Sequence, residues 1–271
     1  MVSRPDLTLL NWRNECVTRT LGNPMIDAKE TRAQAFEVKF VVDVQMGERI
    51  REWARNFLDA DPHGTGPFGD EYRTSTLYFD TAEGHVFHRW GSYGRAKYRI
   101  RRYGDSDVAF LERKLRRQGM LVKRRTQVPL HELERSGDVS GSRLSSGEWF
   151  HRRAETRALR VVCQVSYNRM ARAIDTSTGS ARLTLDQSLR AAAVCGAQFR
   201  SEPGEVISPK LILELKFKSH VPTIFKQLVE DCGLSPQTAS KYRLAMAALN
   251  VYPSSGVASP SAVTTGRTEH A

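Results

Sequence analysis

The chain has 271 residues, and its 41 lysines and arginines outnumber its 30 aspartates and glutamates, leaving a formal net charge of +11. A chain of this length forms one large domain with a sizeable core, without needing disulfides or a structural metal. The positive charge indicates a polyanionic partner: nucleic acid, an anionic membrane or a phosphate-rich small molecule. The four cysteines are far apart, which excludes both a zinc site of paired cysteines and a secreted disulfide framework.

No apolar run approaches the roughly 20 residues that a membrane-spanning helix needs. The N-terminus alternates charged and apolar residues and lacks the apolar centre of a signal peptide. We therefore expect a cytoplasmic protein without a membrane span. Residues 1–33 lack periodicity, and residues 253–271 are rich in Ser, Thr, Gly, Ala and Pro. This composition predicts a flexible N-terminus, a folded domain over 34–252 and a disordered tail.

Alternation and turn signals predict a series of strands joined by short connections, which favours antiparallel neighbours. The predicted strands are 36–42, 74–80, 96–103, 108–115, 121–130, 161–174, 182–186 and 211–217. Apolar residues at helical spacing predict helices over 46–58 and near 148–159. Two closing helices follow, one from Pro222 to about Gly233 and one that opens at Ser235 and Pro236, a cap followed by a first-turn proline.

The predicted strands carry their charges on one face. Because side chains alternate along a strand, Lys97, Arg99 and Arg101 share a face opposite Tyr98 and Ile100. The same alternation places further charged residues together on other strands, namely Glu37, Lys39, Glu112, Lys114, Arg182, Asp186, Glu214 and Lys216. One explanation is an open sheet that packs on helices through its apolar face and leaves the charged face in solvent.

Stacking so many cations on adjacent strands argues for a different arrangement. Like charges directly opposite each other destabilise a sheet by about 0.2–1 kcal/mol per pair, unless an anion arrives. If the strands curl into a closed barrel, the charged faces point inward and the apolar faces pack against outer helices. We therefore predict an α+β fold, an antiparallel β-barrel tunnel with flanking helices. The carboxylates that would lie among the interior cations and offer hard oxygen ligands to Mg²⁺ or Mn²⁺ are Glu37, Glu112, Asp186 and Glu214.

Nine segments appear in an order that is more specific than any one of them alone. They are FEVKF (36–40), STLYFD (75–80), KYRIRRY (97–103), FLERK (110–114), VKRR (122–125), SYNRMA (166–171), RLTLD (182–186), LELKF (213–217) and SKYR (240–243). Together the series resembles the VTC (vacuolar transporter chaperone) domain of polyphosphate polymerases, within the CYTH-like superfamily of triphosphate tunnel metalloenzymes. The resemblance covers about residues 34–250.

The resemblance implies that basic side chains in the tunnel hold phosphates. Carried over residue by residue, it implies catalytic roles for Arg99, Arg101, Lys114 and Arg182. It implies substrate binding by Lys39, Lys123, Arg169, Lys216 and Lys241, the last from the final helix near one mouth. A metal ion, Mn²⁺ or Mg²⁺, would be held by Glu214, with Glu112 as the second candidate.

The reaction implied by the resemblance is transfer of the γ-phosphate of ATP to a growing polyphosphate chain. ATP and inorganic polyphosphate are thus the expected partners. The alternative is a triphosphatase of the CYTH type, a group whose sequences begin with an E-x-E-x-K motif. Here Ala35 stands at the first glutamate position, before Glu37 and Lys39, so one metal-binding carboxylate is missing. This departure favours the polymerase over the hydrolase.

A non-enzymatic module that binds polyphosphate or nucleic acid is the alternative from another class. Binding of single strands requires aromatic rings on the basic face, whereas Tyr98 and Phe217 fall on the apolar face opposite the cations. We therefore expect no specific binding of nucleic acid. The role of Tyr78 and Asp80 stays open at this stage, because contact with substrate and a buried strand end explain them equally well.

Overall fold

The computed structural model describes residues 36–252 with the exception of 118–119, 136–146, 178 and 203. The segments predicted to be flexible, 1–33 and 253–271, lie outside the described residues. The strands are β1 (Phe36–Val42), β2 (Asp59–Ala60), β3 (Glu71–Asp80), β4 (Ala96–Tyr103), β5 (Val108–Arg117), β6 (Met120–Pro129), β7 (Arg160–Thr176), β8 (Gly179–Ala193), β9 (Glu205–Ser208) and β10 (Leu211–Phe217). The helices are α1 (Val44–Phe57), the 3-10 helix η2 (Gly91–Arg95), α2 (Leu130–Arg135), α3 (Glu148–Thr156), α4 (Thr223–Asp231) and α5 (Lys241–Ala248).

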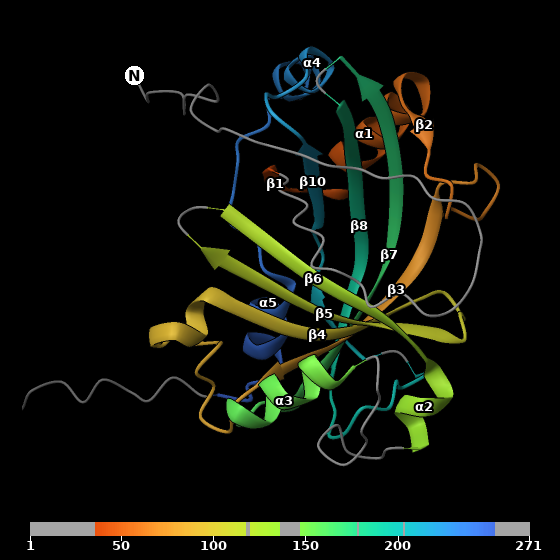
Figure 1. The fold of residues 1–271 in the computed structure, drawn as a ribbon. Coiled ribbons are helices and arrows are strands. Elements are labelled where there is room, and N and C mark those ends of the chain that lie inside the picture. The colour runs from red at the N-terminus through yellow and green to blue at the C-terminus, as the bar shows by residue number, and fades with distance from the viewer. Residues whose placement is uncertain (1–35, 118–119, 136–146, 178, 203, 253–271) are drawn as a thin grey trace, which may run out of the picture.

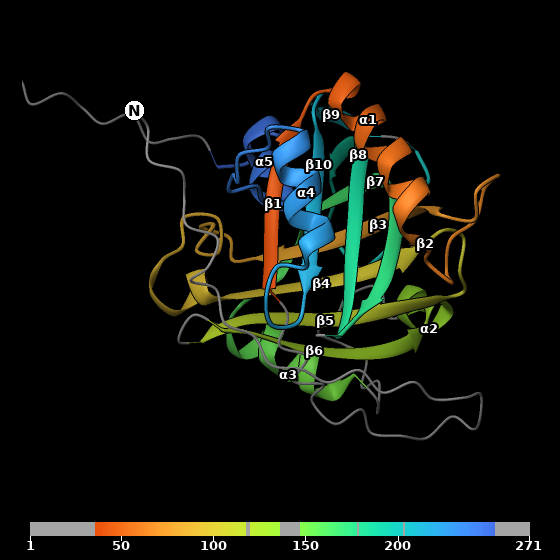
Figure 2. The same cartoon turned by 90° about the horizontal axis from the view of Figure 1, so that it is seen from above.

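All described strands belong to one antiparallel sheet. Its order is β1-β10-β8-β7-β3-β4-β5-β6, with β2 paired to β7 and β9 paired to β8. The sheet is strongly curved, so that β4, β5 and β6 run across the direction of β1, β10, β8 and β7 (Figures 1 and 2). Right-handed twist accumulating over many strands produces such curling. One face of the sheet therefore becomes an interior surface.

The predicted tunnel-type α+β fold is confirmed, but the hydrogen-bonded closure of the barrel is not. Within the described residues, β1 and β6 are the two edges and do not pair with each other. Side chains connect this region instead, because Lys114 Nζ of β5 lies 3.2 Å from Glu37 Oε2 of β1. The sheet is therefore curved but open, and at this point an ion pair takes the place of a ladder of backbone hydrogen bonds.

Helices α1 and α4 cover the outer face of one half of the sheet (Figure 2). Ile50 and Ala54 of α1 and Phe225 of α4 are fully buried, and they share a core with Leu213 and Leu215 of β10. Helix α1 begins after Asp43, an N-cap whose side chain accepts a hydrogen bond from the Met46 backbone N–H at 2.8 Å. The outward apolar residues of these strands are thereby removed from water, and the charged residues are left facing inward.

Helices α3 and α5 complete the second half of the core. Phe150 of α3 packs edge-on against Tyr98 on the outer face of β4, with ring centroids 5.8 Å apart. Helix α5 lies on the inner side, where Tyr242 packs against Tyr78 of β3 at 5.3 Å. Because α5 occupies one end of the interior, it places the residue before Tyr242, Lys241, among the inward charges.

The predicted bounds of the last helix and of strand β8 are wrong. The last helix begins at Lys241 and not at Ser235, and Ser240 is the cap that accepts from the Arg243 N–H. The preceding segment follows β1 instead, since the Gln237 N–H donates to the Lys39 carbonyl at 2.8 Å. Strand β8 continues past Asp186 to Ala193 through a bulge opposite 166–168, which interrupts the alternation that sequence patterns detect.

Within the described part of the chain, no helix has the length and apolarity that crossing a bilayer requires.

Candidate functional site

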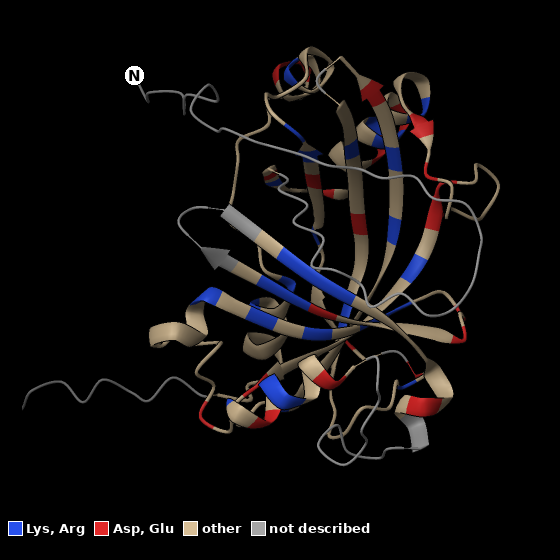
Figure 3. Cartoon of the chain, viewed as in Figure 1, with Lys and Arg blue, Asp and Glu red and all other residues tan. Residues whose placement is uncertain are grey.

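The interior surface is lined by cations from nearly every strand of the sheet. Directly opposed pairs in the register place them on the same face, such as Lys97 with Lys114 and Lys216 with Arg182. Bands of positive charge run along β4, β5 and β6 and continue on β7 and β8 (Figure 3). The predicted site residues brought to this face are Lys39, Arg99, Arg101, Glu112, Lys114, Lys123, Arg169, Arg182, Glu214, Lys216 and Lys241.

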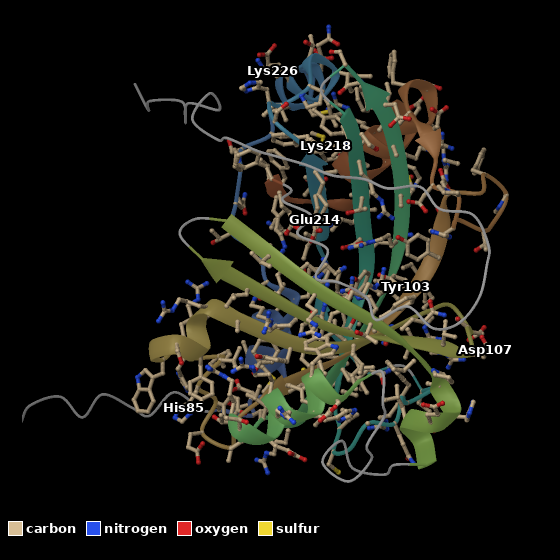
Figure 4. All side chains as sticks on the ribbon, in the orientation of Figure 1. His85, Tyr103, Asp107, Glu214, Lys218 and Lys226 are labelled. Carbon is tan, nitrogen blue, oxygen red and sulfur yellow. The ribbon has the colours of Figure 1, made fainter. Side chains whose placement is uncertain are left out.

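Glu214 is the centre of the first ionic cluster. Its carboxylate oxygens lie 3.0 Å from Lys39 Nζ and 3.2 Å from both Lys216 Nζ and Lys241 Nζ. Burial opposes ionisation, but the lysines Lys241, Lys39 and Lys216 hold the pKa of Glu214 well below its usual range. Figure 4 places Glu214 between the two sets of strands, away from Lys218 and Lys226.

Glu37 belongs to the same cluster. Lys39 Nζ is 3.0 Å from a Glu37 oxygen and 3.0 Å from a Glu214 oxygen, so one ammonium group joins two carboxylates from neighbouring strands. Burial and the Glu214 charge both raise the pKa of Glu37, yet Lys216, Lys39 and Lys114 lower it below its usual range overall. The sequence placed Glu37 among the carboxylates that could offer oxygen ligands to a metal, but the resemblance favoured Glu214 and Glu112.

Asp186 extends the cluster toward β7. Arg169 holds this carboxylate through two hydrogen bonds, at 2.6 Å from Nε and 2.7 Å from Nη2. Lys241 Nζ lies 2.5 Å from the same carboxylate and also contacts Glu214. Asp186 is fully buried, and burial would raise its pKa, but Arg169 and Lys241 lower it. The bidentate geometry fixes Arg169 in one orientation.

Glu112 is the centre of a second cluster, on β4, β5 and β6. Its carboxylate lies 2.6 Å from Arg99 Nε, 2.7 Å from Lys123 Nζ and 3.1 Å from Arg125 Nε. Burial is outweighed by Arg99, Lys123 and other cations, which keep the pKa of Glu112 well below its usual range. Burial lowers the pKa of Lys123 to about 8, because the ammonium group is removed from water.

Arg101 is held by a hydroxyl group, and Arg182 by a hydroxyl group and a carboxylate. Arg101 is 5% exposed and donates to Thr76 Oγ1 at 3.2 Å, and no ion pair joins it to a carboxylate among the described residues. Arg182 donates to the Tyr72 hydroxyl at 2.8 Å and pairs with Asp61 at 2.7 Å. The Tyr72 ring in turn contacts Tyr103, 5.7 Å between centroids. This aromatic pair links the positions of the two arginines.

Tyr103 and Lys97 are interior residues that sequence analysis did not select. Burial alone would raise the pKa of Tyr103, but Arg101, Arg125 and Lys123 lower it to about 7. Burial lowers the pKa of Lys97 to about 7, and the nearby charges of Lys39 and Lys114 add to the shift. Lys97 shares the strand face of Arg99 and Arg101, so alternation was sufficient to include it.

Two carboxylates that share one ammonium group are the best candidates for a metal site. Glu37 and Glu214 converge on Lys39, and carboxylate oxygens are the ligands that Mg²⁺ and Mn²⁺ prefer. Glu112 fits less well, because among the described residues no second carboxylate shares its cationic partners Arg99, Lys123 and Arg125. No group of three or more His, Cys, Asp or Glu residues with metal-binding spacing occurs in the described ranges. With Glu37 and Glu214 as the protein's donors, an ion held here would need phosphate oxygens or water to complete its ligands.

Asp80 has a structural role at the end of β3, and Tyr78 of the same strand packs against Tyr242 of helix α5. The Asp80 carboxylate is fully buried and accepts hydrogen bonds from the backbone N–H groups of Thr81, Val86 and Phe87 at 2.7–2.9 Å. It also accepts from the hydroxyl of Tyr242. These bonds attach α5 to the end of β3 and so position Lys241 in the interior.

A curved antiparallel sheet with outer helices and an inward face of lysines, arginines and isolated carboxylates defines the class of triphosphate tunnel proteins. Within this class, a model of the VTC domain matches residues 34–250. The chain therefore belongs to the VTC domain family, as its ordered motifs predicted.

Several solved structures are similar to the chain at low sequence identity. A candidate adenylate cyclase from Bacillus halodurans is 14% identical, covers 75% of this chain and 92% of its own, and has a TM-score of 0.48. A candidate adenylyl cyclase from Hippeastrum, for which a dominant triphosphatase activity is described, is 13% identical, with coverages of 79% and 96% and a TM-score of 0.46. The protein PH1819 from Pyrococcus horikoshii OT3 is 10% identical, with coverages of 79% and 99% and a TM-score of 0.45. No curated protein sequence matched the chain.

Proposed function

We propose that the chain is a polyphosphate polymerase that transfers the γ-phosphate of ATP to the end of a polyphosphate chain in its basic interior. The observation that carries the proposal is the convergence of lysines and arginines from seven strands and α5 on one surface with few carboxylates. A linear polyanion with one charge per phosphate is the ligand that such a surface neutralises. Membership of the VTC domain family supports the same substrate class.

Phosphoryl transfer proceeds through a loose transition state, so the protein mainly has to position phosphates in line and balance their charge. In our proposal Arg99, Arg101, Lys114 and Arg182 contact the reacting phosphates. Lys39, Lys123, Arg169, Lys216 and Lys241 hold the remainder of ATP and the polyphosphate chain. The carboxylates Glu112 and Asp186 keep arginines in fixed orientations, which reduces the reorganisation needed when phosphates bind. The attacking group is a terminal phosphate oxygen, so no protein nucleophile is required.

Glu214 would hold Mn²⁺ or Mg²⁺, with Glu37 as its partner in preference to Glu112. The ion would neutralise part of the negative charge of the bound phosphates. The lysines now paired with these carboxylates, Lys39 and Lys216, would then turn toward phosphate, since each ammonium group has three donors.

A triphosphatase is the second candidate function, because it would use the same cations and replace the attacking phosphate with water. The substitution that favours the polymerase, Ala35 in the place of a glutamate, lies outside the described residues.

The experiment that separates the two functions incubates the purified protein with ATP and Mn²⁺ and measures orthophosphate and long-chain polyphosphate in parallel. Polymer formation supports the proposal. Rapid release of orthophosphate without polymer, under every metal and primer condition, would establish the triphosphatase instead.

If neither product forms while polyphosphate still binds tightly, the chain is a binding module on an enzyme scaffold. The location of the protein in the cell and the identity of the nucleotide stay predictions. The preference for ATP is tested in the same assay by replacing it with GTP at equal concentration.

A further inference from the structure

A second cationic surface lies on the outer face of β4, β5 and β6, behind the wall of the interior. Two adjoining grooves of about 410 and 360 Å³ run between these strands, η2 and α3, and both are lined by Arg113 and Arg153. We call this surface the outer arginine groove, formed by Arg95, Arg113, Arg124, Arg152, Arg153 and Arg157. Among the described residues lining it, Glu148 is the single acidic one, and it pairs with Arg152 at 3.1 Å.

Arginines in the groove are held by aromatic packing. Arg113 and Arg124 are directly opposite each other on β5 and β6, an arrangement of like charges that costs stability. The Arg124 guanidinium lies 4.4 Å from the ring centroid of Trp149, whose indole N–H donates to Thr126 Oγ1 at 2.9 Å. Nε of Arg124 has no hydrogen-bond partner among the described residues. The Trp149 ring, and not a partner of this buried Nε, therefore holds the guanidinium in its orientation.

The outer arginine groove begins at the strand ends where the interior lysines are. Ala96 of β4 and Leu115 of β5 are a register pair that lines the groove. The next pair, Lys97 and Lys114, faces the interior. Arg95, which lines the groove, directly precedes β4. Cations therefore continue from the interior, around the ends of β4 and β5, to the outer face.

We infer that the outer arginine groove binds a segment of inorganic polyphosphate that extends beyond the interior. The inference rests on the proposed function. Strand β4 has 8 residues and spans only about 27 Å, so a long polyphosphate chain extends past the interior, where the adjoining arginines of the groove offer it further partners. Guanidinium groups bind phosphate oxygens through two parallel hydrogen bonds, which suits a repeating chain of phosphates.

The aromatic residues of the groove favour phosphates over nucleic acid. Binding of single strands uses open aromatic faces on which bases stack. Here Arg124 covers Trp149, Arg157 lies 4.1 Å from the ring centroid of Tyr93, and Tyr98 is only 4% exposed. The groove offers N–H donors, and its aromatic faces are already in use. A phosphate chain is therefore the ligand class that fits.

The test compares binding of long-chain polyphosphate and of tripolyphosphate by titration calorimetry at one fixed salt concentration. The double variant Arg124→Gln/Arg153→Gln should bind the long chain about tenfold more weakly and tripolyphosphate unchanged, because only the long chain reaches the groove. The control Arg49→Gln/Lys226→Gln removes the same charge from exposed positions on α1 and α4, and should change neither affinity. Arg153→Gln alone, at an exposed position of α3, should give a smaller loss in the same direction even if Arg124→Gln disturbs packing.

Equal affinity of the double variant and the unaltered protein for the long chain would overturn the inference. The same conclusion holds if the control variant loses as much affinity, since net charge would then explain the effect. Single-stranded DNA that binds more tightly than polyphosphate, and is lost in the double variant, would assign the groove to nucleic acid. Failure of the unaltered protein to bind tripolyphosphate would contradict the proposed function, and the comparison between variants would still judge the groove.

Discussion

Lys97 of β4 and Lys114 of β5 face each other directly on the interior surface, and no carboxylate pairs with Lys97 among the described residues. Lys97 donates instead to Ser240 Oγ at 2.9 Å. Because its pKa is lowered to about 7, a large share of Lys97 is neutral at physiological pH. An incoming phosphate chain would supply the missing negative charge and raise this pKa again.

Phosphate binding should therefore be coupled to proton uptake. We expect tripolyphosphate binding at about pH 8 to take up protons, measured by calorimetry in buffers of different ionisation enthalpy. Lys97→Met should reduce the number of protons taken up and weaken binding by about tenfold, whereas Lys218→Met, beyond the end of β10, should change neither. Binding without any dependence on the buffer would contradict the coupling.

The stability of the ligand-free protein should rise with pH above neutrality. The folded-state pKa values of Lys97 and Tyr103 are lowered to about 7 and that of Lys123 to about 8, below the values of the unfolded chain. Between about pH 7 and 10 the unfolded chain thus holds more protons than the folded one, and the free energy of unfolding increases with pH. Urea unfolding across this range measures it, and a flat or falling profile would contradict the assignment.

Glu214→Gln should abolish metal-dependent turnover while the fold remains, because it removes the carboxylate that Lys39, Lys216 and Lys241 surround. The loss of charged hydrogen bonds should lower the free energy of unfolding by about 2 kcal/mol. Activity is measured as a function of Mn²⁺ concentration, with circular dichroism as the check on folding. Unchanged activity at limiting Mn²⁺ would move the metal to Glu112, so Glu112→Gln is the comparison variant.

Replacing Lys39 or Lys114 by alanine should weaken polymer formation and hydrolysis together. Both lysines face the interior and pair with the Glu37 carboxylate. Once a lysine is lost, this carboxylate would compete with the substrate phosphates for the remaining cations. We expect at least about a tenfold decrease in kcat/KM for each variant. Lys226→Ala, on the outer surface of α4, is the matched control. A variant that lost only one of the two reactions would show that these reactions use different cations.

Ala35→Glu should shift the ratio of the two reactions. A carboxylate at this position completes the E-x-E-x-K pattern with Glu37 and Lys39 and strengthens a metal site that activates water. Orthophosphate release should rise relative to polyphosphate formation, measured on the same samples. An unchanged ratio would mean that the missing glutamate does not decide between polymerase and hydrolase.

The sequence by itself determined which strand face is charged and which is apolar. Alternation in KYRIRRY and LELKF placed Arg99, Arg101 and Glu214 on the inner face, since side-chain direction in a strand follows from local geometry alone. The ordered motifs also predicted the family: eight of the nine lie on strands of the sheet, and SKYR caps and begins α5, which brings Lys241 into the same interior. The cap that begins α5 was missed, because Ser235–Pro236 is a stronger local signal than Ser240.

Only the tertiary structure decided which charges meet. Glu37 and Glu214 share Lys39, whereas Glu112 lies among Arg99, Lys123 and Arg125, and no local pattern distinguishes these carboxylates. Likewise, Arg113 and Arg124 belong to alternating strands, but their surface exists because α3 brings Trp149 against them. Distance in space, and with it pairing and pKa, depends on strand order and sheet curvature. These are set by the packing of the whole chain and not by the spacing of residues along it.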